Sequence, residues 1–406
     1  MVSSVRIRRL HLRNFKSVEH GVIEFTPLTL LVGRNGVGKS NIVDALRFLS
    51  DALGSTLEYA IRERGGIDEV RRKSLGGRPT NPGLAVDLET DQWSASYGFR
   101  IAAVEGRSFR VDHEVCEVRS SSGQRRAYFE IRKGKQKAWS LDSAQPAVVS
   151  DRLYLVAASG SPEFFPVFDI LTRMTFHNLN PQVMRSPVRP EPGERLSHDG
   201  GNLPSVIKKL QSQSPEQLDR VVHYLRAIGV PVTRISHKPA GSLETIEVAQ
   251  ETPVPQGRRN SNFDAIALSD GTLRALGILV SLVSGRSDRS GPSLVAIEEP
   301  ETALHPAAVG ALVDALLEGA DVTQTLVTCH SPDLLDHPAV TGEMIRVVLL
   351  DGGKTVIGPL DDQKQQILQD HLFSAGELLR LDQLTPDEKR IREQQAAAGT
   401  LFEAIV

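Results

Sequence analysis

Cysteine is scarce in this sequence, since Cys116 and Cys329 are the only two among 406 residues. Two cysteines exclude a disulfide framework and are typical of a reducing compartment. No stretch approaches the roughly 18 uninterrupted apolar residues of a membrane span. The N-terminal MVSSVRIRRLHL alternates charged and apolar residues, whereas a signal peptide would have an apolar block. We therefore expect a cytoplasmic protein with no membrane contact.

Positive charge is not in excess either, because 47 Lys and Arg stand against 50 Asp and Glu, for a net charge of −3. This balance excludes a uniformly basic nucleic-acid coat, so any DNA contact has to come from local patches. With 40% hydrophobic, 24% charged and only 5% aromatic residues, the composition is that of an ordinary globular protein. The length is sufficient for two or three lobes with sizeable cores.

One glycine-rich motif lies between two apolar segments. Residues 33–40 read GRNGVGKS, in the spacing G-x-x-x-x-G-K-[ST]. Residues 28–32 before it resemble a buried parallel strand, and apolar residues recur at helical spacing over 42–49 after it. This context predicts a phosphate-binding loop for ATP, with Lys39 on the β- and γ-phosphates and Ser40 on Mg²⁺. The predicted nucleotide-binding residues are Gly33, Arg34, Asn35, Gly36, Val37, Gly38, Lys39, Ser40 and Asn41.

Two further apolar segments end in chemically versatile side chains. Residues 294–297 lead to Glu298 and Glu299, and residues 325–327 lead to His330. Open α/β sheets bind ligands at the C-terminal edge of their parallel strands. We therefore expect Glu298 to join the Mg²⁺ shell, Glu299 to orient or deprotonate the attacking water, and His330 to sense the γ-phosphate. With Lys39, the last two form the predicted catalytic set, although surface glutamates and a structural histidine would leave the same pattern.

A polar turn precedes another apolar helical pattern near the middle of the C-terminal half. Its residues are Leu268, Ser269, Asp270, Gly271 and Thr272. Ser269 stands where an N-cap would, and Gly271 leaves backbone N–H groups open to an anion. Taken alone, the segment is better explained as a simple capping turn.

The rest of the chain divides into segments with different residue patterns. Residues 84–141 alternate in short runs between turn signals, which predicts an antiparallel β-meander inserted after the first helix. Residues 162–228 predict helices, followed by a small β segment and a polar loop at 252–262, and the tail predicts a hairpin around Gly352-Gly353 and a charged helix from Pro386 to about Ala397. No heptad run is long enough for a coiled-coil arm.

These patterns predict an α/β phosphate-loop fold in three parts. Residues 1–160 would form lobe I with the inserted meander, 161–262 a helical and small β insert, and 263–406 lobe II with the tail.

Two basic clusters are candidate DNA contacts. The first strand carries Arg6, Arg8, Arg9, Arg13 and Lys16, and its alternation slips at Arg8-Arg9, which indicates a β-bulge. A later hairpin places Arg125, Arg126, Lys133, Lys135 and Lys137 around Tyr128 and Phe129. Such clusters suit nucleic-acid phosphates and bases. The solvated face of an ordinary sheet has the same composition, so both interpretations stay open.

Together these motifs resemble the ABC-type ATPases, specifically the branch that contains RecF, the SMC proteins and the OLD-type defence ATPases. The resemblance covers both ends of the chain, with two departures: Glu298 replaces a more usual aspartate, and LSDGT replaces LSGGQ. It is carried by LRNFKS at 12–17, GRNGVGKSN at 33–41, LSDGT at 268–272, EEPETALHP at 298–306 and TCHSP at 328–332.

The resemblance implies an ATPase head that dimerises head to tail around two ATP molecules with Mg²⁺. Residues 268–272 of one subunit would face Lys39 of the other, with Ser269 and Gly271 on the γ-phosphate. Glu301, Thr302 and Ala303 would match the D-loop at the subunit interface. Gln182 is a candidate for the Q-loop glutamine.

The resemblance also implies a DNA-directed role in repair, chromosome maintenance or anti-phage defence, with double-stranded DNA and a separate effector protein as candidate partners. OLD-type proteins that cut DNA carry a TOPRIM domain with a D-x-D pair, whereas the residues after His330 offer only Asp361-Asp362, so we do not expect intrinsic cutting. Two alternatives are the nucleotide-binding subunit of a transporter and a scaffold clamped by ATP with little turnover.

Overall fold

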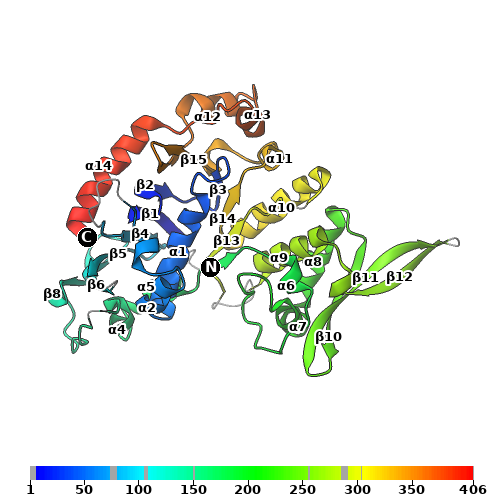
Figure 1. Cartoon of the computed structure of the whole chain (residues 1–406), viewed down its shortest axis with the longest axis horizontal. Helices are drawn as coiled ribbons and strands as arrows, with labels where there is room; N and C mark the ends of the chain where they lie inside the picture. Colours follow the sequence, from blue (N-terminus) through cyan, green and yellow to red (C-terminus); the bar gives the residue numbers. More distant parts are fainter. Residues whose placement is uncertain are drawn as a thin grey trace.

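The computed structural model describes residues 6–73, 80–104, 108–149, 151–254, 257–284, 291–302 and 304–405. Three sheets organise the chain, with helices between and around them (Figure 1). No helix in these ranges is long and apolar enough to cross a membrane.

A six-stranded sheet gathers strands from the whole length of the chain. It is parallel except for one edge strand, and its order is β16 (Lys354–Pro359), β15 (Ile345–Asp351), β3 (Leu28–Val32), β14 (Gln324–Cys329), β13 (Leu294–Glu298) and β9 (Thr175–His177). Parallel strands of this kind are apolar on both faces because both are covered. In β3, Leu31 belongs to one core cluster, whereas Leu30 and Val32 belong to the other.

A seven-stranded antiparallel sheet covers one side of the first. Its order is β2 (Val18–Glu24), β1 (Arg6–Phe15), β4 (Gly83–Glu89), β5 (Trp93–Val104), β6 (Ser108–Ser120), β7 (Arg125–Arg132) and β8 (Lys135–Trp139). The predicted meander is confirmed, and it continues the sheet begun by β1 and β2. The predicted bulge is confirmed too, because the β1–β4 register shifts between Ile7 and Arg9.

The third sheet is an antiparallel arm made of β10 (Val232–Ala240), β11 (Leu243–Val254) and β12 (Gly257–Asp264). The prediction of a polar loop over 252–262 was wrong, because β12 pairs with β11 from Gly257 to Asp264. Most β12 side chains are exposed. A strand that buries neither face has no apolar alternation, so the backbone pairing left no signal in the sequence.

The helices lie between the sheets and around them (Figure 1). Those of the N-terminal half are α1 (Lys39–Gly54), α2 (Leu57–Arg62), α3 (Ile67–Val70), α4 (Tyr154–Ala158), α5 (Phe165–Thr172) and α6 (Pro181–Met184). Further along the chain are α7 (Leu203–Gln213), α8 (Pro215–Ala227), the 3₁₀ helix η2 (Ala265–Ala267), α9 (Asp270–Val283), α10 (Pro306–Val322), α11 (Pro332–Leu335), the 3₁₀ helix η3 (Gly342–Met344), α12 (Asp362–Gln369), α13 (Ala375–Arg380) and α14 (Glu388–Ile405).

Figure 1 shows α1 and α9 on opposite sides of β13 and β14, which is consistent with their membership of different core clusters. The predicted tail hairpin is confirmed as β15 and β16. The charged tail helix begins at Glu388 and, at Ile405, ends later than predicted. Residues 161–262 contribute β9 to the central sheet as well as the helical segment and most of the arm, and the three-part division of the chain stays a prediction.

Candidate nucleotide site

The phosphate loop joins the end of β3 to the start of α1. Gly36 and Gly38 have φ of 80° and 102°, a left-handed conformation that favours glycine. The Lys39 side chain folds back over the loop, and its Nζ donates to the carbonyls of Gly33 (2.7 Å) and Arg34 (3.0 Å). Arg34, Asn35, Gly36 and Ser40 are exposed, whereas Lys39 is buried. The loop is therefore formed around its lysine and open at its rim.

The hairpin of β15 and β16 supports the loop from behind. Thr355 Oγ1 donates to the Val37 carbonyl (2.7 Å) and lies 2.7 Å from Ser17 Oγ. Asn41 Nδ2 donates to the same Ser17 oxygen (2.6 Å). A Cβ on Gly38 would lie 2.2 Å from Thr355 Oγ1, so glycine is required there for space as well as for φ. Sequence reasoning gave Ser17 and Thr355 no role here.

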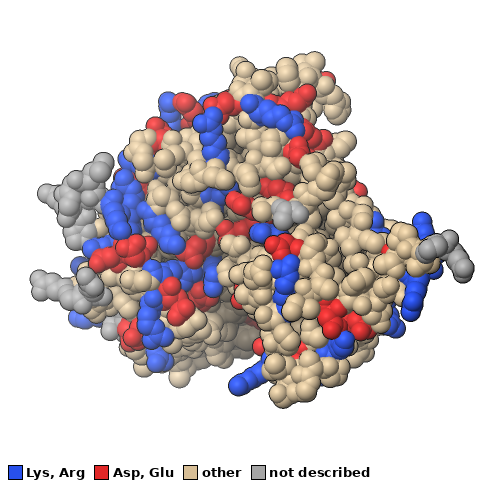
Figure 2. Space-filling model, turned by 45° about the vertical axis from the view of Figure 1, so that its right-hand side comes forward, with Lys and Arg blue, Asp and Glu red and all other residues tan. Residues whose placement is uncertain are grey.

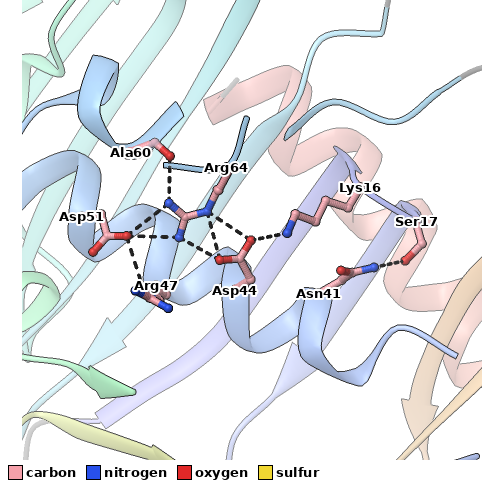
Figure 3. Close-up of polar contacts among 8 residues, drawn as sticks. All are labelled: Lys16, Ser17, Asn41, Asp44, Arg47, Asp51, Ala60 and Arg64. Atoms are coloured by element: carbon pink, nitrogen blue, oxygen red, sulfur yellow. Dashed lines mark hydrogen bonds and ion pairs between the residues drawn. The ribbon is translucent and has the colours of Figure 1, made fainter. Parts of the chain in front are cut away.

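The outer part of α1 is fixed by Arg64, from the segment after α2, whose side chain is only 7% exposed (Figure 3). Arg64 donates through Nε to both Asp44 oxygens (2.9 and 3.1 Å) and through Nη1 to Asp51 (3.1 Å) and the Ala60 carbonyl (2.8 Å). Lys16 adds an ion pair to Asp44 (2.6 Å). Burial by itself would raise the pKa of Asp44, but Arg64 and Lys16 outweigh it and lower that pKa.

The predicted acidic and histidine strand ends meet at one sheet edge. Glu298 ends β13 and lies in register with Thr328 of the adjacent β14. Glu299 has φ of 45°, which is uncommon for a residue other than glycine. Its backbone N–H donates to both the carbonyl and the hydroxyl of Thr328 (3.1 Å each), and these contacts hold the strained residue in place. His330 Nδ1 then lies 3.6 Å from Glu299 Oε1.

This edge is electrostatically coupled to the loop lysine. Burial lowers the pKa of Lys39, although the nearby Glu299 and Glu301 carboxylates oppose the shift. Burial raises the pKa of the Cys329 thiol well above its usual range, and the thiol donates to the Ser331 carbonyl (3.3 Å). Cys329 is therefore a neutral structural residue at neutral pH.

The arrangement fits a nucleoside triphosphate. In the part of the chain that the structure describes, Glu301 Oε2, Thr302 Oγ1 and His330 Nδ1 are buried atoms without a hydrogen-bond partner. Buried polar atoms are normally paired, so their clustering marks a place where a further polar group is expected. Around these atoms, the glycine loop supplies N–H donors on one side, and the carboxylates at the strand ends supply acceptors on the other.

Two family models match the chain. Residues 6–76 match one described as "AAA ATPase domain", and residues 152–336 match one described as "AAA domain, putative AbiEii toxin, Type IV TA system". The Old nuclease of Escherichia phage P2 is 22% identical over 361 residues, which are 82% of this chain and 57% of that protein. The DNA replication and repair protein RecF of Porphyromonas gingivalis is 51% identical over 45 residues, which are 11% of this chain and 12% of that protein.

Among solved structures, a Smc head domain from Pyrococcus furiosus, with an extended coiled coil and bound to the C-terminal domain of ScpA, aligns with a TM-score of 0.52. The identity is 13%, and the alignment covers 91% of this chain and 99% of that chain, which shows a shared fold. The two ATPase family models, these relatives and the shared fold together support the resemblance to the RecF/SMC/OLD-like ATPases. The predicted fold class, a phosphate-loop head with an inserted meander and helical segment, is confirmed.

In this RecF/SMC/OLD-like chain, the LSDGT turn opens α9. Ser269 is the N-cap, as predicted, and its hydroxyl accepts from the Thr272 N–H (3.2 Å). Leu268 is buried in the chain's own core, whereas Ser269 and Asp270 are exposed. Arg185 donates to the Leu268 carbonyl (3.0 Å) and pairs with Asp270. Among the described residues, no hydrogen bond or ion pair joins this turn to the phosphate loop.

The other predicted site residues lie in two different places. Gln182 is on α6, which packs against α9, so it accompanies the LSDGT turn. Glu301 is buried, Thr302 is half-buried, and Ala303 lies outside the described residues.

The chain spans 57% of the length of Old nuclease and 12% of RecF.

The two basic clusters are neutralised only in part by neighbouring acids. On β1, Arg8 pairs with Glu89 (2.9 Å) and Arg9 with Glu24 (3.0 Å). In the later hairpin, Arg125 pairs with Glu117 and stacks on Tyr128. Phe129 is buried in the core, so it is not available to stack on a base. Figure 2 shows Lys and Arg interspersed with Asp and Glu on the face in view.

Proposed function

We propose that this protein binds and hydrolyses ATP, dimerises when ATP is bound, and drives a DNA-directed process together with a separate effector. The observation that carries the proposal is the convergence of three chain segments at one sheet edge. Lys39 lies in a preformed phosphate loop, Glu299 is held by Thr328, and His330 lies 3.6 Å from the Glu299 carboxylate.

In this proposal each residue has one task. The loop N–H groups and Lys39 bind the phosphates, and Ser40 and Glu298 hold Mg²⁺. ATP supplies the phosphoanhydride bond that water cleaves. Glu299 orients that water and accepts its proton, and His330 contacts the γ-phosphate side of the site. Glu298 is half-buried, and its side chain makes no hydrogen bond or ion pair with another described residue, so it is available to a metal-bound water.

Dimerisation is proposed because the LSDGT turn does not reach the loop of its own subunit. Ser269 is exposed, and Ile266 just before it is 76% exposed, an unusual position for a large apolar side chain. A second subunit placed head to tail would cover Ile266 and bring Ser269 and Gly271 to the γ-phosphate. ATP would then tie the two lobes together until hydrolysis releases them.

The DNA-directed role and the effector rest on the relatives. Old nuclease is named for its nuclease activity and RecF for DNA replication and repair, and the Smc head was solved with a bound partner domain. Because part of each basic cluster is paired with acids, we propose that DNA contact depends on the assembled dimer more than on one strong patch.

The test is the mass in solution of the Glu299→Gln protein, measured by light scattering with no nucleotide, with Mg-ATP, and with Mg-ATP plus double-stranded DNA. We expect a monomer that becomes a dimer with ATP, because this variant keeps the binding loop but lacks the carboxylate that activates water. A further DNA-bound species would support the DNA role. A mass that never changes would contradict ATP-gated dimerisation and favour a structural nucleotide.

A further inference from the structure

Glu301 engages the histidine segment of its own chain. Its carboxylate is buried, with 7% of the residue exposed. Glu301 Oε1 accepts hydrogen bonds from the backbone N–H groups of His330 (3.1 Å) and Ser331 (3.3 Å). The same oxygen lies 3.6 Å from His330 Nδ1. One carboxylate oxygen thus contacts three nitrogen atoms of a segment 29 and 30 positions away in sequence.

These contacts differ from those of a residue at a subunit interface. An interface residue would present its carboxylate outward, whereas Glu301 points into its own fold and bridges the ends of β13 and β14. Burying a carboxylate costs several kcal/mol unless good partners offset it. Here the partners are two backbone donors at the start of the segment that carries His330.

The geometry assigns Glu301 as a positioning residue for His330, an inference that rests on the proposed ATP hydrolysis. By accepting from two successive N–H groups, its carboxylate fixes the path of the chain at residues 330 and 331. This path sets the imidazole 3.6 Å from Glu299 Oε1. Glu301 Oε2 has no hydrogen-bond partner among the described residues, so the contacts of this carboxylate with the histidine segment are those of Oε1.

The test compares two conservative variants, one that keeps the length of the side chain and one that keeps its negative charge. Glu301→Gln keeps a side chain of the same length with a carbonyl oxygen that can accept both N–H groups. Glu301→Asp keeps the negative charge but is one methylene shorter, so it cannot reach both donors from the same backbone. A matched control is Glu244→Gln, which alters a buried glutamate of the arm that binds Ser205 and His237 far along the chain from this edge.

Three quantities are measured for each full-length variant: kcat and KM for ATP hydrolysis, the dissociation constant of a fluorescent ATP analogue, and hydrogen–deuterium exchange of the peptide that contains His330 and Ser331. We expect Glu301→Asp to lower kcat about tenfold to a hundredfold, as misplaced catalytic groups do, and to speed exchange in that peptide. Nucleotide affinity should change less than about threefold, because the Lys39 and loop hydrogen bonds do not involve Glu301. Glu301→Gln should lose clearly less of its kcat than Glu301→Asp, and Glu244→Gln should stay near the unmodified protein.

Equal losses in the Gln and Asp variants, or a greater loss in Gln, would overturn the inference, because charge and not reach would then matter. Unchanged exchange at the His330 peptide in Glu301→Asp would overturn it as well. The exchange measurement needs no turnover, so it remains decisive if the unmodified protein binds ATP without hydrolysing it. That last result would refute the proposed hydrolysis separately from the positioning role.

Discussion

The hydroxyl of Thr355 joins the tail hairpin to the phosphate loop, and we predict that Thr355→Val weakens ATP binding. Thr355 is 2% exposed, and its Oγ1 donates to the Val37 carbonyl at 2.7 Å. Valine has nearly the same shape but no hydroxyl, so the Val37 carbonyl would lose this donor. Ser17 Oγ, the other neighbour of Thr355, would keep its hydrogen bond from Asn41.

The size of the effect on stability and on ATP binding follows from the loss of this one donor. One buried polar group left without its partner costs about 1–3 kcal/mol, so we expect the free energy of unfolding to fall by about 2 kcal/mol. Because the orphaned carbonyl belongs to the loop itself, part of the cost will appear as loop disorder that ATP has to reverse. Each 1.4 kcal/mol corresponds to a tenfold change in affinity, so we expect the dissociation constant for ATP to rise about three- to tenfold.

The assay pairs urea unfolding, followed by circular dichroism, with fluorescence titration of an ATP analogue. Thr355→Ser is the matched control, since it keeps Oγ and removes only a methyl group. We expect Thr355→Ser to bind nucleotide like the unmodified protein and Thr355→Val to bind more weakly. If the two variants have the same affinity and the same unfolding midpoint, the hydroxyl does not support the loop.

Three other predictions address separate parts of the molecule. Lys39→Ala should abolish detectable ATP binding, because it removes the cation that the loop holds in place; calorimetry showing unchanged affinity would reject the phosphate loop. Ser269→Arg should leave ATP binding by the monomer intact and block ATP-dependent dimerisation, and a normal dimer by light scattering would refute the contact in trans. Burial raises the pKa of Glu114 to about 7 from its usual 4.5, so the folded state retains this proton longer than the unfolded chain. The free energy of unfolding should therefore fall as the pH rises from 4.5 to 7, by about 3 kcal/mol, and a Glu114→Gln variant that keeps the same slope in denaturation curves would contradict this origin.

Local features of the site could be predicted from the sequence. The phosphate loop has a fixed spacing because a strand, a glycine turn and a helix N-terminus leave few ways to surround a phosphate. Ser269 could be identified as an N-cap because its hydroxyl bonds within one turn. The bulge near Arg8 and the hairpin at Gly352-Gly353 also depend on near neighbours.

The alternation of apolar and polar residues reveals a strand only where one face of that strand is buried. The exposed strand β12 had been expected to be a loop, since polar side chains on both faces carry no period. Phe129 and its basic neighbours suggested a base-stacking surface, but the sequence does not say which side of a strand meets the core.

The sequence by itself determined which residues carry the predicted ATP chemistry: the glycines and Lys39 of the loop, the acids at the end of β13, and His330. Tertiary structure decided how these groups are held. The hydrogen bond from Thr355 to the Val37 carbonyl joins residues 318 positions apart. The hydrogen bond from the His330 N–H to Glu301 joins residues 29 positions apart. Such contacts depend on the order of strands in the sheet, with β14 between β3 and β13. Hydrogen bonds between strand ends follow from that order, which arises from the packing of the whole core and not from any local spacing in the sequence.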